Sequence, residues 1–116
     1  MSFVYLGSPY SHPDPIVMEQ RFQDACAAAG YLMRRGEVVF APICHSHPIA
    51  STLDPSHPTD HDFWMAQDLP FLKLASRLHI LMLDGWRDSK GIGREIQYAF
   101  DHGIAITFMD WPLPGR

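Results

Sequence analysis

The apolar residues of the chain fall into four short runs separated by segments of helical periodicity. These runs are Phe3 to Gly7, Glu37 to Ala41, Leu78 to Leu83 and Ile104 to Phe108. The first two are closed by turn-forming residues, Gly7 and Pro42, and all four predict short buried β-strands. The third run has the apolar density expected where helices cover both faces of a sheet.

Three segments between or beside these runs carry apolar residues at spacings of three and four, which predicts amphipathic helices. The stripe of residues 15–35 comprises Met18, Phe22, Ala25, Cys26, Ala29, Leu32 and Met33. The stripe of residues 61–75 comprises Phe63, Trp64, Gln67, Phe71 and Leu74. The inner face of residues 89–101 comprises Ile92, Ile96, Ala99 and Phe100. Pro70 is expected to kink the second helix or to start a new one.

Between Pro42 and Asp60 the periodicity fails. Prolines at positions 42, 48, 55 and 58 interrupt this segment, and His45, His47 and His57 are scattered among them. The segment therefore predicts a long irregular loop, of a kind that in compact domains is usually functional or disordered.

The resulting order, β-α-β-α-β-α-β, predicts a three-layer α/β/α fold with a small parallel sheet of four or five strands, flavodoxin- or Rossmann-like. No repeat or linker divides the chain, so we expect a single domain over residues 1–116. In such folds the ligand binds beyond the carboxyl ends of the strands. Those ends lead here into residues 7–10, 41–47, 84–93 and 108–111, where the chemically capable polar residues also concentrate.

Composition narrows the function classes. With 47% hydrophobic residues and 19% charged residues over 116 positions, wholesale disorder is excluded. A net charge of −4 without a basic run argues against duplex nucleic acid as a partner, although backbone amides can still bind one phosphate. Two cysteines, Cys26 and Cys44, cannot build a disulfide scaffold. The chain shows neither a signal-peptide pattern nor an apolar run of membrane-spanning length, so we expect a cytoplasmic protein without a membrane partner.

The most informative segment runs from Asp84 through a glycine-rich turn to Glu95. Asp88 or Ser89 is a credible N-cap for the helix that follows. Near a helix N-terminus the macrodipole favours an ionised carboxylate, and such a carboxylate beside a pocket can act as a nucleophile or base. The alternative is that Glu95 is a solvated helix residue. The segment lacks the third glycine of a dinucleotide-binding fingerprint, and the chain has no P-loop.

Other residues admit two interpretations each. Asp68 can accept hydrogen bonds from a ligand hydroxyl, or it can be a surface acid or a cap. The histidines of residues 45–61 invite a zinc interpretation, but their spacing fixes no geometry, so no metal is expected. Tyr10, Trp64 and Trp86 can stack on a base or belong to the core.

Taken together, Tyr5-Leu6-Gly7-Ser8-Pro9-Tyr10, Asp68 and the stretch Asp88 to Glu95 resemble the nucleoside 2-deoxyribosyltransferase superfamily. This superfamily includes the 2'-deoxynucleoside 5'-monophosphate N-glycosidases, and the similarity is greatest to a small bacterial and phage branch. The resemblance covers nearly the whole chain. Its most specific element is the Ser-x-Gly-x-Gly-x-Glu spacing of residues 89–95, with Asp68 located 21 residues before Ser89.

The resemblance implies glycosyl transfer without a cofactor. Glu95 would attack C1' of a nucleoside or nucleotide, and water or a second base would resolve the glycosyl-enzyme ester, following the logic of retaining glycosidases. Asp68 would hold sugar hydroxyls, and Tyr5 would orient the nucleophile. The implied substrate-binding residues are Gly7, Ser8, Pro9, Tyr10, His45, His47, Trp86, Asp88, Ser89, Gly91 and Gly93. Asp14 or a histidine of residues 45–47 would protonate the departing base.

The sequence leaves the substrate requirement and the function open, and it predicts the oligomeric state. Residues 10–12 replace the arginine and glycines with which related enzymes bind a 5'-phosphate, so this requirement is undecided. A binding module that holds a nucleotide-like ligand without turnover is the main alternative, followed by an unrelated metal or flavin site. The apolar stretch of residues 108–113, together with the resemblance, predicts a homodimer or larger homo-oligomer in which a second copy covers the site.

Overall fold

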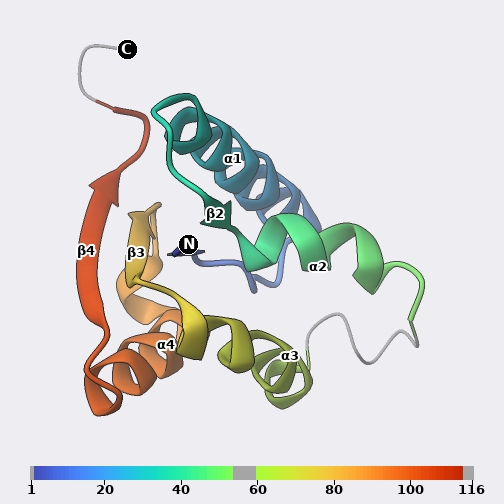
Figure 1. Cartoon of the computed structure of the whole chain (residues 1–116). Helices are drawn as coiled ribbons and strands as arrows, with labels where there is room; N and C mark the ends of the chain where they lie inside the picture. Colours follow the sequence, from blue (N-terminus) through green and yellow to red (C-terminus); the bar gives the residue numbers. More distant parts are fainter. Residues whose placement is uncertain (1, 54–59, 114–116) are drawn as a thin grey trace.

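A computed structural model describes residues 2–53 and 60–113 of the chain (Figure 1). Its elements, in chain order, are β1 (Val4–Gly7), α1 (Pro15–Arg34), β2 (Val39–Phe40), α2 (Pro42–Ala50), α3 (His61–Leu74), β3 (Arg77–Met82), the short 3-10 helix η2 (Trp86–Asp88), α4 (Lys90–Asp101) and β4 (Ala105–Asp110). The four strands form one parallel sheet in the order β2-β1-β3-β4. The predicted three-layer α/β/α fold is therefore confirmed, with four strands.

Side chains of the central strands alternate between two apolar layers. Leu6 and Leu81 point toward α1 and α2, whereas Tyr5 and Ile80 point toward α3 and α4. Figure 1 shows α1 on one side of the sheet and α4 on the other. Within the sheet, β2 lies next to β1 toward one edge, whereas β3 and then β4 lie toward the opposite edge. The strand order thus reverses between β1 and β3, which is where open α/β sheets place their ligands.

Residues 42–50 form a helix, so the prediction of an irregular loop is wrong there. Pro42 occupies the start of α2, where a missing N–H costs nothing, and Pro48 lies near its end. Two hydroxyls satisfy carbonyl groups at that end: Ser51 donates to Pro48 O and Thr52 donates to Ile49 O. Prolines at both ends are thus compatible with a nine-residue helix. His57, with Pro55 and Pro58, lies outside the described residues.

Two helix predictions need correction. First, no new helix starts at Pro70, because α3 continues through this residue. The Asp60 side chain caps the start of α3 by accepting from Phe63 N, and the burial of Met65 and Leu72 stabilises the helix. Second, Phe100 is not on the inner face of α4 but is 76% exposed. The buried positions of α4 are Ile92, Glu95 and Ala99. The buried face of α4 thus includes Glu95 and excludes Phe100.

Other apolar residues of the predicted stripes are also exposed, namely Met33, Phe71 and Leu74. The C-terminal stretch behaves in the opposite way, because Met109 is buried and Trp111 and Leu113 pack against the core beneath α1. Its apolar character is thus partly explained within one chain. None of the helices in residues 2–53 and 60–113 has the length and apolar composition needed to cross a membrane.

Candidate functional site

A pocket of about 440 Å³ lies beyond the carboxyl end of β1 and is walled by the segment after β1, by α2 and α3, and by the start of α4. Its lining residues are Ser8, Tyr10, Ser11, Pro42, Ile43, Ser46, His47, Ala50, His61, Trp64, Met65, Asp68, Asp88, Ser89, Lys90, Gly91 and Glu95. Segments that are far apart in the sequence thus meet at the reversal of strand order.

Glu95 is the most constrained group of this pocket. Its side chain is 3% exposed, and its Oε2 accepts a hydrogen bond of 2.5 Å from the Tyr5 hydroxyl. Its other oxygen lies over Gly7, where a Cβ atom would be 2.9 Å from Oε1 and 3.3 Å from Ile80 Cδ1. Gly7 is therefore needed for the close approach of the carboxyl group to β1, and Tyr5 fixes its orientation.

The pKa of Glu95 is raised to about 8, above all by burial; the hydrogen bond from Tyr5 acts to lower it, and the neighbouring Asp68 contributes to raising it. Burial therefore outweighs the helix macrodipole, which by itself favours the ionised carboxylate. Glu95 is the sixth residue of α4, beyond the first turn where the dipole acts most strongly. Burial and Glu95 likewise raise the pKa of Tyr5 well above its usual value, so its phenol remains a hydrogen-bond donor.

Asp68 is also buried, at 6% exposure, on the inner side of α3. Burial raises its pKa to about 7. Within the described part of the chain, no group hydrogen-bonds to its carboxyl oxygens, which face the pocket. The interpretations of Asp68 as a surface acid or as a cap for a helix starting at Pro70 are therefore wrong. Its carboxyl group is available to a ligand, near its own pKa at neutral pH.

The start of α4 supplies polar groups at the pocket edge. Ser89 caps the helix by accepting from Ile92 N at 3.2 Å. Upstream, Gly85 adopts φ 85°, a left-handed conformation that the turn from β3 into η2 requires. Arg21 of α1 ties this turn to the segment after β1, because its guanidinium donates to Asp84 O and to Ser11 O, both at 3.0 Å. One side chain thus sets the spacing of two pocket edges.

A second arrangement reaches the pocket from α2. The Tyr10 hydroxyl lies 2.6 Å from Nδ1 of His47, and Nε2 of His47 lies 3.0 Å from Glu19 Oε1. The Phe22 ring stacks on the imidazole at 4.1 Å between centroids. Hydrogen bonds from Gln23 and His47 lower the pKa of Glu19, so an anion stands at the outer end of this chain. The arrangement links a pocket-lining phenol to a surface carboxylate through one imidazole.

Two buried hydroxyls at the pocket, those of Ser8 and Ser46, have no hydrogen-bond partner in the described part of the chain. Buried polar atoms are rarely left in this state, and a bound ligand is one way to satisfy them. Together with Asp68 they define where polar groups of a ligand would sit. Ser46, like His61, Met65 and Lys90, was not predicted as a site residue, because its position depends on the unexpected helix α2.

Not all predicted site residues meet in the pocket. Ser8, Tyr10, His47, Asp68, Asp88, Ser89, Gly91 and Glu95 line it, and Tyr5 and Gly7 hold Glu95 from behind. Pro9 is fully buried and Gly93 has open space around it. His45 lines an adjoining cavity of about 170 Å³, and the Trp86 ring packs 5.7 Å from that of Phe108.

Asp14 does not reach the pocket lining, because it caps α1 by accepting from Ile16 N. As for metals, the described residues contain no cluster of three histidine, cysteine or carboxylate side chains suited to hold an ion.

Comparison with known proteins gives one match. A family model described as "Domain of unknown function (DUF1937)" matches residues 2–110, which includes every described residue that lines the pocket. None of the curated proteins matches the chain.

Proposed function

The chain belongs to the DUF1937 family, and we propose that it cleaves or transfers the N-glycosidic bond of a small (deoxy)nucleoside or nucleotide. The observation that carries this proposal is the buried Glu95 carboxyl group, held by Tyr5 at the wall of a pocket of about 440 Å³. The resemblance noted in the sequence contributes the substrate class. A second buried carboxyl group, Asp68, supports it, because glycosidic cleavage commonly uses two carboxyl groups.

In the proposed reaction, one Glu95 oxygen attacks C1' of the sugar while the bond from C1' to the base nitrogen breaks. The electron pair of that bond leaves with the base, which takes up a proton. Water or a second base then attacks C1' and releases the sugar from the ester. Tyr5 holds Oε2 of Glu95 at 2.5 Å and so leaves the other oxygen for the sugar. Positive charge developing on the sugar favours the ionised form of Glu95 once substrate is bound.

Two proton sources lie at the pocket. Asp68 has a pKa raised to about 7, so a large fraction is protonated at neutral pH. Tyr10 is connected through His47 to Glu19. Asp14 is no longer a candidate for protonating the base, because it acts as the cap of α1. We assign the sugar hydroxyls to the Asp68 carboxyl group and to the Ser8 hydroxyl, which has no hydrogen-bond partner in the described part of the chain.

The test is incubation with a panel of ribonucleosides, deoxynucleosides and their 5'-monophosphates, with free base measured by chromatography. We expect base release by the wild-type protein and its loss, by at least 10²-fold, in Glu95→Gln, because the amide cannot form the ester. Asp101→Asn, on the exposed side of the same helix, is the matched control and retains activity. Base release that is equal in wild type and Glu95→Gln would refute the role of Glu95.

A binding module without turnover is the second candidate. It is favoured by the pKa of about 8 for Glu95, since a neutral carboxyl group is a poor nucleophile but a good hydrogen-bond donor. This candidate predicts that a panel member binds without base release. Glu95→Gln then keeps its affinity within a few fold, because the amide can also donate.

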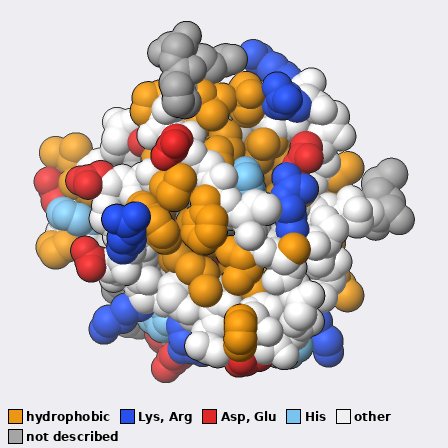
Figure 2. Space-filling model, turned by 90° about the vertical axis from the view of Figure 1, so that its left-hand side faces the viewer, with side chains coloured by type: hydrophobic (Ala, Val, Ile, Leu, Met, Phe, Trp, Pro, Cys, Tyr) orange, Lys and Arg blue, Asp and Glu red, His pale blue; other side chains and the backbone are white. Residues whose placement is uncertain are grey.

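We also propose that the chain forms a homo-oligomer. Phe108 on the edge strand β4 is 50% exposed, and Figure 2 shows hydrophobic side chains gathered on the face that carries this strand. An edge strand with an exposed aromatic ring is a ready contact surface. Light scattering tests this proposal: a dimer or larger species supports it, and a monomer at micromolar concentration counts against it.

A further inference from the structure

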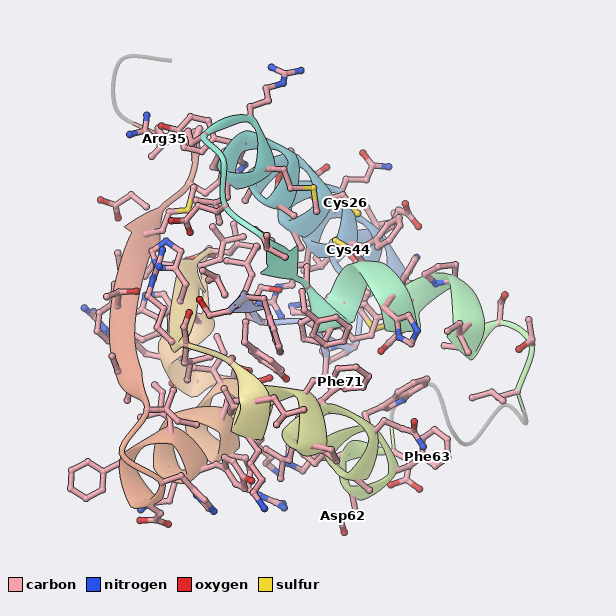
Figure 3. The ribbon with its side chains drawn as sticks, in the orientation of Figure 1. Cys26, Arg35, Cys44, Asp62, Phe63 and Phe71 are labelled. Carbon is pink, nitrogen blue, oxygen red and sulfur yellow. The ribbon has the colours of Figure 1, made fainter. Side chains whose placement is uncertain are left out.

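Cys26 and Cys44 lie side by side although they are 18 residues apart in the sequence. Their Sγ atoms are 2.9 Å apart, with the Cys26 thiol donating to the sulfur of Cys44. Figure 3 shows the two side chains at the boundary between α1 and α2. Both are free thiols of intermediate exposure. The separation exceeds a disulfide bond of about 2.0 Å by less than one ångström, so the two sulfur atoms have only a short distance to close.

We propose that Cys26 and Cys44 form a reversible disulfide that locks α2, one wall of the pocket, onto α1. This inference does not depend on the proposed reaction. It concerns a modification site that the sequence interpretation missed, because that interpretation placed Cys26 in a helix and Cys44 in a loop.

The position of α2 explains why such a bond matters. Cys44 is flanked on the same short helix by Ile43, Ser46 and His47, all of which line the pocket. The N-cap residue of α2 is Ala41, whose methyl group cannot accept a capping hydrogen bond, and Pro48 within the helix lacks a backbone N–H. Contacts with α1, which include the pair between His47 and Glu19, help to hold this helix in place. A covalent link beside these contacts restricts the pocket wall directly.

The oxidant is a small disulfide such as oxidised glutathione. A thiolate of the pair attacks one sulfur of the small disulfide, which forms a mixed disulfide and releases one small thiol. The other cysteine then attacks the protein sulfur of the mixed disulfide, so the Cys26–Cys44 bond forms and a second small thiol leaves with the second proton. Burial, above all, raises the pKa of Cys44 to about 12, so this thiol is protonated at neutral pH and becomes a better nucleophile as pH rises.

The experiment exposes the full chain to excess oxidised glutathione at pH 8 and quenches it with N-ethylmaleimide in denaturant. We expect a protein lighter by two hydrogen atoms, without blocked thiols, whose unreduced digest joins the Cys26 and Cys44 peptides. Dithiothreitol should restore both thiols. Two alkylated thiols, glutathione adducts alone, or disulfide-linked pairs of chains would each overturn the proposal.

Hydrogen exchange then tests the lock. Backbone amides of α2 should exchange at least several-fold more slowly in the oxidised protein, while those of α4 remain unchanged. Cys44→Ser, treated in the same way, should show no slowing, and Cys26→Ser provides a second variant if the first does not fold. An oxidised protein in which α2 exchanges as fast as in the reduced one would refute the lock.

Discussion

Replacement of Glu95 by glutamine should remove the loss of stability that this carboxyl group causes as pH rises. The pKa of Glu95 is about 8 in the folded chain against 4.5 for the unperturbed group, and burial is the main cause. Below pH 4.5 both the folded and the unfolded state hold the proton, and the stability that this group contributes is fully present. As pH rises toward 8, the unfolded chain releases the proton first, so the free energy of unfolding falls.

The size of the effect follows from the shift. Each pKa unit corresponds to about 1.4 kcal/mol, so the shift from 4.5 to about 8 corresponds to a loss on the order of 5 kcal/mol. Glutamine has nearly the same shape, can accept from Tyr5, and does not titrate. We therefore expect Glu95→Gln to gain several kcal/mol relative to wild type between pH 5 and pH 8.5.

Urea unfolding followed by tryptophan fluorescence, at intervals of one pH unit, measures this difference. Asp68 titrates in both proteins, so most of its contribution cancels in the comparison. Asp101→Asn is the control and should follow the wild-type curve. If wild type and Glu95→Gln run parallel from pH 5 to pH 8.5, then Glu95 titrates normally and the picture of a buried neutral carboxyl group is wrong.

Further predictions concern the neighbours of Glu95. Gly7→Ala should destabilise the chain by about 1–3 kcal/mol and lower base release, because the new Cβ would lie 2.9 Å from Glu95 Oε1. Urea unfolding measures the first effect and chromatography the second. Unchanged stability and activity would contradict the close approach of Glu95 to Gly7. Tyr5→Phe should cost about 1–3 kcal/mol at pH 8 and above, where the Glu95 carboxylate would be left without its donor; equal stability there would argue against the hydrogen bond. Asp68→Asn should be more stable than wild type above pH 7, because burial disfavours the ionised form of Asp68. The control is Asp62→Asn at an exposed position, which should change stability by less than about 0.5 kcal/mol. Similar behaviour of the two variants in urea unfolding would exclude a buried Asp68.

The sequence was sufficient to predict the fold class and its strands, because short apolar runs and apolar spacings of three and four depend only on local sequence. It did not predict the strand order, since several orders satisfy right-handed crossovers. The helix over residues 42–50 was missed, because its prolines sit where a helix tolerates them and its apolar residues form no regular stripe.

Within the site, the importance of Glu95 was predicted but its charge state was not. A helix position alone does not reveal that Gly7 and Tyr5 enclose the carboxyl group and that burial outweighs the macrodipole. The same limit applies to Cys26 and Cys44, whose proximity arises from the packing of α1 against α2. Contacts between elements distant in sequence depend on how helices dock, which local patterns do not encode.

The most direct test of the proposed chemistry is the mass of the protein quenched during turnover of an active panel member. Acid quench should trap a fraction of the chain carrying one sugar residue, and peptide mapping should place that sugar on Glu95. Base release without any adduct on Glu95, or an adduct on another residue, would contradict the proposal that this carboxyl group is the nucleophile.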